Sequence, residues 1–104
     1  MAKKRLVFVS KGKQDLIRLE KKYALQVMDD LPILENPPWP QGKVKRLRGT
    51  DFWEMKTGDF RTIFWPDKDN VVILRVVNRR DLVLAVRGMN PIAILRWLRE
   101  NRNR

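Results

Sequence analysis

The stretch that most constrains the fold is residues 47–81, in which apolar segments alternate with very short turn sequences. Glycine, proline, asparagine and aspartate mark each turn, and these residues favour chain reversal. Turns of only a few residues join antiparallel neighbours, because a parallel pair needs a crossover of about a dozen residues or more. We therefore predict an antiparallel sheet with strands at 43–48, 52–57, 60–65 and 71–77.

The last of these four strands, Val71 to Val77, is apolar at successive positions instead of at alternate ones. That pattern is typical of a strand buried on both faces. We expect it to be central in the sheet, with helices covering at least one side.

The N-terminal third predicts a strand followed by helix. Residues 5–10 are rich in β-branched and aromatic side chains. One helical face then follows at spacings of three and four, through Leu16, Leu19, Tyr23 and Val27. Pro32 should kink or end a helix. Two helices broken near residues 23–25 fit this pattern as well as one long helix.

The remaining segments are irregular or helical. Residues 36–42 form a proline-rich loop that Trp39 could anchor. Residues 81–86 fit either a further strand or an irregular segment. Asn90 and Pro91 suit the start of a C-terminal helix. Its predicted apolar face is Ile92, Leu95 and Leu98, widened by Ile94 and Trp97, and its basic side is Arg96, Arg99 and Arg102.

These elements predict an α+β fold in one domain spanning residues 1–104. We expect a small antiparallel sheet of four or five strands, two N-terminal helices on one face and a C-terminal helix. The clustered aromatic residues of the strands, Trp53, Phe60, Phe64 and Trp65, are predicted to pack in the core in preference to stacking on bases.

Composition narrows the function. The chain has 23 Lys and Arg against 12 Asp and Glu, a formal charge of +11, so we expect an anionic partner: nucleic acid, the ribosome or an acidic protein. It has no cysteine and no histidine, which removes the usual metal ligands and the usual neutral-pH base, and we predict no metal and no cofactor. No apolar run approaches the roughly 20 residues of a membrane span, so we expect a cytoplasmic protein.

Three motifs resemble the RelE/ParE superfamily of bacterial toxins. They are Leu47-Arg48-Gly49, then Trp53-Glu54-Met55-Lys56-Thr57-Gly58-Asp59-Phe60-Arg61, then Asn78-Arg79-Arg80-Asp81. The resemblance implies a toxin of a type II toxin–antitoxin system, held inactive by a cognate acidic antitoxin. For RelE-type members it implies endoribonuclease activity on ribosome-bound mRNA, by attack of a ribose 2′-OH on the adjacent phosphate.

The resemblance also implies site residues. Arg61 matches the arginine that stabilises the scissile phosphate, although a plain pairing with Asp59 or Glu54 is the alternative. Arg80 matches a second phosphate-binding arginine, and Arg79 replaces it if the register is off by one. On a strand only one of these two adjacent residues could face a given site.

The sequence departs from the family where the nucleases carry two lysines and a tyrosine. Phe52 and Glu54 occupy the lysine positions, Asn78 replaces a histidine, and Leu82-Val83-Leu84 contains no tyrosine. Lys56, on the same strand face, is the predicted catalytic substitute. Further nucleic-acid-binding candidates are Lys45, Arg46 and Arg48 on the neighbouring strand, together with Arg79.

These departures leave two alternatives to the ribonuclease. One is a ParE-like toxin that inhibits DNA gyrase without nuclease activity. The other is a non-catalytic nucleic-acid-binding module.

Overall fold

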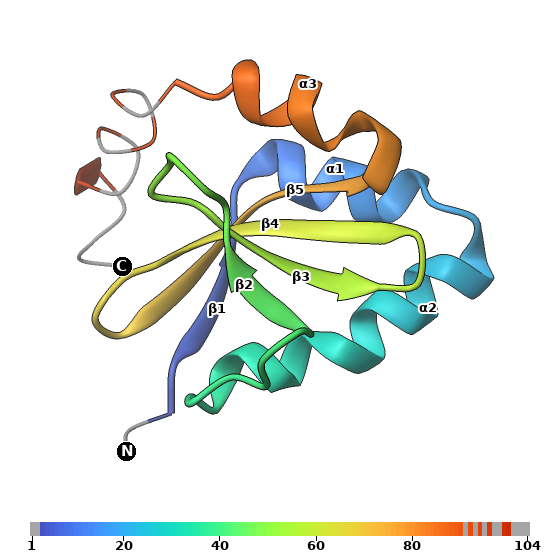
Figure 1. Cartoon of the computed structure of the whole chain (residues 1–104), viewed down its shortest axis with the longest axis horizontal. Coiled ribbons are helices and arrows are strands. Elements are labelled where there is room, and N and C mark those ends of the chain that lie inside the picture. The colour runs from blue at the N-terminus through green and yellow to red at the C-terminus, as the bar shows by residue number, and fades with distance from the viewer. Residues whose placement is uncertain (1–2, 91, 93, 95, 97–98, 101–104) are drawn as a thin grey trace.

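The computed structural model describes residues 3–90, 92, 94, 96 and 99–100. Within them, five strands form one sheet in the order β1-β5-β4-β3-β2 (Figure 1). The strands are β1 (Arg5–Phe8), β2 (Val44–Arg46), β3 (Trp53–Thr57), β4 (Phe60–Pro66) and β5 (Asn70–Asn78). The helices are α1 (Ser10–Arg18), α2 (Lys21–Asp30) and α3 (Leu82–Arg87), with 3₁₀ turns η1 (Leu31–Glu35) and η2 (Arg79–Asp81). The predicted α+β class is confirmed.

The strands from β2 to β5 pair antiparallel with their sequence neighbours, as predicted. The tight turn between β3 and β4 depends on Gly58, whose φ of +56° is a conformation that residues with a side chain rarely adopt. This turn places Lys56 directly opposite Arg61. It therefore fixes the relative positions of two predicted site residues.

The expectation of a purely antiparallel sheet is wrong for β1, which pairs parallel to β5 through Arg5↔Asn70 to Phe8↔Ile73. Two helices and three strands separate β1 from β5 in sequence. A connection that long permits either direction, whereas the short turns of the hairpins permit only one.

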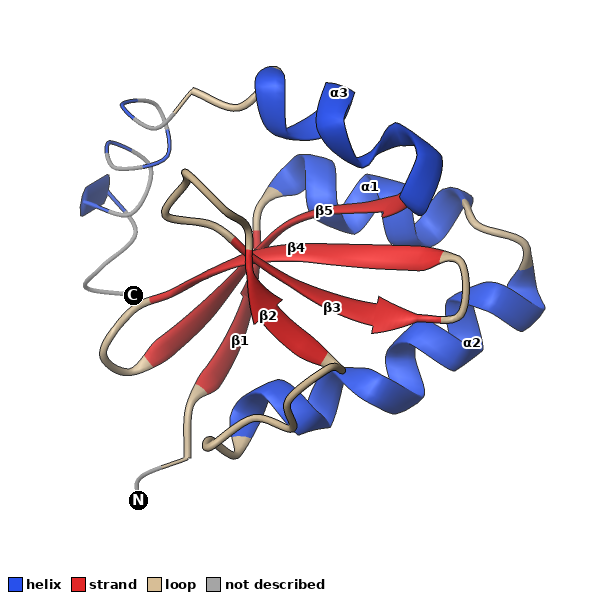
Figure 2. Ribbon diagram, in the orientation of Figure 1, coloured by secondary structure: helices blue, strands red, loops and turns tan. Residues whose placement is uncertain are grey.

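The sheet is covered on both faces (Figure 2). On the first face, Val27 of α2 and Leu31 and Leu34 of η1 pack against strand residues that include Met55 and Phe64. On the second face, Ala85 of α3 packs with Ile63, Val72, Leu74 and Val77. Strand β5 contributes to both clusters, which explains its continuous apolar pattern.

Three predictions about the helices are resolved. The N-terminal helical segment is two helices, but they part at Leu19 and Glu20, before the predicted break. Helix α2 ends at Asp30, and Pro32 lies in the tighter 3₁₀ turn η1 that follows. Residues 82–87 are helical, so the two expected descriptions of 81–86 are both wrong, and this helix covers the face opposite α2.

Where β1 ends, helix α1 lies beside β5 and one of its side chains accepts a backbone hydrogen bond from that strand. The backbone N–H of Val9 donates to the Ile73 carbonyl, the last bond of the β1–β5 ladder region. Beyond it, the Asp15 carboxylate accepts from the backbone N–H of Val76 (3.0 Å) and pairs with Arg75 (2.6 Å). A side chain thus satisfies a strand edge that no strand reaches.

The predicted anchoring of the proline-rich loop by Trp39 is confirmed. Its indole N–H donates to the Leu34 carbonyl (3.1 Å), and its ring meets those of Trp53 and Phe64 edge-on at 5.3 Å. The predicted core packing of the strand aromatics holds too: Phe64 is fully buried, and Trp53, Phe60 and Trp65 pack against the two clusters.

The start of the C-terminal helix is also as expected, because the Asn90 side chain accepts from the Ile92 N–H (3.0 Å). The described residues beyond it, 92, 94, 96, 99 and 100, are helical. The other members of that prediction, Pro91, Leu95, Trp97, Leu98 and Arg102, lie outside the described residues.

Candidate functional site

Four charged residues share the second face of the sheet near the β3–β4 turn. Strand alternation and pairing register place Glu54 beside Lys45 and Ile63, and Lys56 beside Arg61. We call Lys45, Glu54, Lys56 and Arg61 the charged strip. Three strands supply it, so backbone hydrogen bonds fix the spacing of its members.

Arg61 turns back toward the β3–β4 turn. Its Nη1 donates to the carbonyls of Gly58 and Phe60, each at 2.9 Å, and forms no ion pair with Asp59 or Glu54 in the described structure. Because the carbonyls occupy only Nη1, its Nε and Nη2 donors remain open among the described residues. The guanidinium is thus held in place by neutral groups and keeps its full charge for an anion.

Lys56 lies opposite Arg61, half-buried between β2 and β4. Within the described chain its ammonium has neither a hydrogen-bond acceptor nor a carboxylate partner. The structure therefore brings together two of the three predicted catalytic cations, and no described carboxylate pairs with either.

Arg79 and Arg80 lie at the same end of the sheet, because Phe60 pairs with Asn78, the last residue of β5. The Arg79 N–H donates to the Asp59 carbonyl (2.7 Å), and its Nε lies 3.5 Å from the Asp59 carboxylate. The Arg80 N–H donates to Asn78, and no partner for its guanidinium is found in the described part of the chain.

Both arginines are exposed and belong to the 3₁₀ turn η2, not to a strand. The expectation that strand alternation would allow only one of them into the site is therefore wrong. Their partners distinguish them: Arg79 has a carboxylate neighbour, whereas Arg80 has none among the described residues.

The other predicted nucleic-acid-binding residues do not all lie near Arg61. Lys45 belongs to the charged strip, but Arg46 lies on the first face, opposite Trp53, and donates to the Thr50 carbonyl (3.0 Å). Arg48 lies in the β2–β3 loop and, with Arg46, lines an open hollow of about 470 Å³. This loop is at the end of β3 away from the β3–β4 turn. The structure does not bring Arg46 or Arg48 together with Arg61.

The sequence predicted Glu54 as a replaced lysine or as a pairing partner of Arg61, not as a buried group. Its side chain is 2% exposed, with Oε1 3.8 Å from the Lys45 ammonium. Its other oxygen, Oε2, is buried without a hydrogen-bond partner. The sequence feature that could have drawn attention to Glu54 is its spacing. It lies two residues from Lys56 on a strand, and therefore on the same face.

On the first face of the sheet, opposite the charged strip, Asp30 holds helix α2 against strand β3. Its carboxylate accepts from the Thr57 hydroxyl (2.7 Å) and from the Lys43 ammonium, which ties α2 to β3. Burial alone raises the pKa of Asp30, but the hydrogen bonds from Lys43 and Thr57 and the charge of Lys43 together outweigh it, and the pKa is lowered. Lys43 is thereby occupied in the fold.

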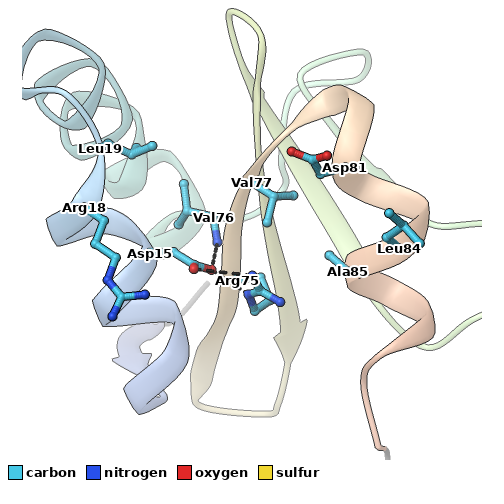
Figure 3. Close-up of a pocket in the computed structure, with 9 residues that line it drawn as sticks. All are labelled: Asp15, Arg18, Leu19, Arg75, Val76, Val77, Asp81, Leu84 and Ala85. Atoms are coloured by element: carbon cyan, nitrogen blue, oxygen red, sulfur yellow. Dashed lines mark hydrogen bonds and ion pairs between the residues drawn. The ribbon is translucent and has the colours of Figure 1, made fainter.

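A hollow of about 450 Å³ lies between α1 and α3 (Figure 3). The Asp15–Arg75 pair lies at its centre, Arg18 and Leu84 line opposite sides, and Asp81 closes one end. Its central charges bind one another, and its two other charged residues, Arg18 and Asp81, are of opposite sign, so it has no excess of cations.

In the described ranges, no three acidic side chains gather closely enough to hold a metal ion. No helix among these residues is both long and apolar enough to cross a membrane.

Comparison with solved structures identifies the fold. A chain of the RelE–RelB complex of Pyrococcus horikoshii superposes with a TM-score of 0.63 and 26% identity, over 74% of this chain and 96% of that one. A chain of the RelBE2 toxin–antitoxin complex of Mycobacterium tuberculosis gives 0.65 and 24%, over 75% and 100%. YafQ of Escherichia coli gives 0.56 and 14%, over 76% and 97%.

The chain has the RelE fold. The expected superfamily resemblance is confirmed at the level of structure. No protein-family model matches the sequence, and no curated protein does. The RelE-like scaffold is therefore conserved in shape more clearly than in sequence.

Proposed function

We propose that this protein is the toxin of a type II toxin–antitoxin system and acts as a RelE-like endoribonuclease on ribosome-bound mRNA. The observation that carries the proposal is that Lys56 and Arg61 lie opposite each other without a carboxylate partner among the described residues. They do so on a fold shared, at 26% identity, with a chain of the RelE–RelB complex of Pyrococcus horikoshii. Arg80, at the same end of the sheet, adds a third cation.

These residues suit the chemistry of phosphodiester transfer. The ribose 2′-oxygen attacks phosphorus, negative charge grows on the phosphoryl oxygens, and the 5′-oxygen leaves. Arg61 can offer its open donors to those oxygens as a planar fork, and Arg80 can hold an adjacent phosphate. We assign Lys56 as the group that protonates the leaving 5′-oxygen.

The proposed partners follow from the same fold and charge. A cognate antitoxin with an acidic segment would neutralise the cations of the strip and cover them. The ribosome, itself rich in phosphate, would supply the surface on which mRNA is presented.

The test compares Arg61→Ala with the wild type. Purified protein is added to translating ribosomes, and new mRNA 5′ ends are mapped by primer extension. We expect Arg61→Ala to lower the cleavage rate about 10²- to 10³-fold, as for removal of one transition-state donor. Arg48→Ala, which removes the same charge at the other end of β3, should retain most of the activity.

The gyrase-inhibiting alternative has one observation in its favour, namely that Phe52 and Glu54 stand where the nucleases carry lysines. It predicts trapped DNA breaks and no new mRNA ends when the protein is expressed in bacteria. That combination would reject the ribonuclease proposal.

A further inference from the structure

Two consecutive arginines follow the end of β5, and they differ in their partners. The Nε of Arg79 lies 3.5 Å from the Asp59 carboxylate, whereas no described residue pairs with the guanidinium of Arg80. Both arginines are exposed. The difference between them therefore comes from the position of Asp59 and not from burial.

Two contacts join Asp59 to Arg79. Besides the ion pair, the backbone N–H of Arg79 donates to the Asp59 carbonyl (2.7 Å). Asp59 belongs to the turn between β3 and β4, and Arg79 is the first residue of η2. The two contacts consequently join that turn to η2, at the end of the sheet where α3 begins (Figure 1).

Each of the two joined segments holds one arginine of the candidate site. In the turn, the Gly58 carbonyl accepts from Nη1 of Arg61 (2.9 Å). In η2, the backbone N–H of Arg80 donates to the Asn78 side chain (3.1 Å). Joining the turn to η2 therefore fixes the backbone of Arg80 relative to Arg61. Donors that are held in place before the substrate binds need no reorganisation during the reaction.

Stability gives little reason for a carboxylate at this place. The two side chains of the ion pair are 67% and 69% exposed, and pairs exposed to that degree stabilise a fold only slightly. A negative charge beside the arginines also opposes the approach of a phosphate. A role in placing Arg80 accounts for Asp59 where stability and attraction of RNA do not.

We propose that Asp59 and Arg79 are positioning residues, whose contact holds η2 on the β3–β4 turn and keeps Arg80 in a fixed position relative to Arg61. The inference rests on the proposed ribonuclease function. Arg80 and Arg61 then bind neighbouring phosphates of the RNA. Arg79 gives its charge to Asp59 and makes no phosphate contact.

The first test measures single-turnover cleavage on programmed ribosomes for the wild type, Asp59→Arg, Arg79→Asp and the double variant. We expect each single variant to be slower by about 5-fold, the factor that one exposed ion pair can supply. The double variant restores the pair with exchanged charges and keeps the formal charge of +11, so it should return to within about 2-fold of the wild type.

Charge effects without positioning predict a different result. Asp59→Arg makes the surface more positive, so it would bind RNA more tightly and cleave at least as fast as the wild type. Asp51→Arg is the matched control, because Asp51 forms an equally exposed ion pair at the other end of β3. It should not slow cleavage.

The second test measures the salt dependence of RNA binding, with folding checked by circular dichroism. Arg80→Ala should reduce the slope of log affinity against log salt by about 1, the value for one lost phosphate contact. Arg79→Ala should leave the slope unchanged. This measurement needs RNA binding but no cleavage.

Three results would overturn the inference. They are a wild-type cleavage rate in Asp59→Arg, a double variant as slow as the slower single variant, and a slope reduced by about 1 in Arg79→Ala. In each of them the wild type still cleaves RNA. Absence of wild-type cleavage instead rejects the proposed function, and the salt slopes then still decide which of the two arginines contacts phosphate.

Discussion

Beyond the end of β1, the carboxylate of Asp15 accepts a backbone hydrogen bond from β5 that a neighbouring strand would otherwise accept. Its oxygens accept from the Arg75 guanidinium and from the Val76 N–H. Both side chains of the pair are largely buried, at 23% and 15% exposure. An ion pair in that setting is costly to break, because the remaining charge has no other partner.

We therefore expect Asp15→Ala to lower the free energy of unfolding by about 2–4 kcal/mol in urea titrations. The control is Asp51→Ala, which removes the exposed pair between Arg46 and Asp51 and should change it by about 0.5 kcal/mol or less. Equal effects of the two variants would contradict a special role for Asp15.

Asp30 predicts how stability responds to acid. Its pKa is lowered from an ordinary value of 3.8, so the folded state binds the proton less readily than the unfolded chain. Its contribution is thus complete above the unfolded-state pKa and is lost as the pH falls through the lower folded value. Between about pH 5 and pH 2, we expect stability to fall more steeply in the wild type than in Asp30→Asn. Parallel curves from thermal denaturation would contradict this.

At the site, the sequence predicted Lys56 and Arg61 on consecutive strands joined by a tight turn. A two-residue turn leaves little freedom in the register, which places them opposite each other. The sequence did not predict the separation of Arg46 and Arg48 from them, which depends on strand alternation and on the length of β2. Nor did it reveal Glu54 as a buried group, since burial depends on the flanking strands and not on the residue's own neighbours in sequence.

Among the elements, α1 is positioned by a close approach. A Cβ added to Gly12 would lie 2.7 Å from the Ile73 carbonyl oxygen, a backbone atom that cannot move aside alone. Gly12 therefore lets α1 contact β5 closely enough for Asp15 to reach Val76.

Gly12→Ala should consequently force α1 away from the sheet and cost about 1–3 kcal/mol in urea-induced unfolding. Gly88→Ala is the matched control, because its Cβ would meet carbonyls at 3.6 Å, an ordinary contact, with φ negative. That variant should be neutral or slightly stabilising. A neutral Gly12→Ala would show that α1 can shift freely.

The elements that the sequence predicted least well are those whose secondary structure or strand direction depends on contacts with residues far away in the sequence. Residues 82–87 are apolar in almost every position, so no period of two or of 3.6 stands out, and Ala85 becomes helical core only by packing on β5. The direction of β1 likewise depends on its distant partner β5. The hairpins were predictable because each turn and its pairing register depend on residues that are close together in the sequence.

At the scale of the whole molecule, the +11 charge is spread over helices, strands and loops, and two acidic residues of the helices are used within the fold. Asp15 and Asp30 each hold a basic residue of the fold, while Lys56 and Arg80 keep their charges free in the described structure. Each such ion pair takes up one charge of each sign, so the excess of basic groups remains available to an anionic partner.

Binding to RNA should therefore weaken steeply with salt, because each neutralised phosphate releases counterions. We expect log affinity to fall linearly with log salt in fluorescence anisotropy. Lys56→Ala should reduce the slope by about 1, the value for one lost phosphate contact. A flat response would assign the charge to the antitoxin instead.

The outer position of β2 has a consequence for the dynamics of the sheet. It is the shortest strand, three residues paired on one side only, and such edges open locally at far lower free energy than a core strand does. Lys45 lies on this strand, so its ion pair with Glu54 joins the edge strand to its neighbour β3. Opening of β2 would break the Lys45–Glu54 ion pair, while Arg61 stays on β4, which pairs with a strand on each side.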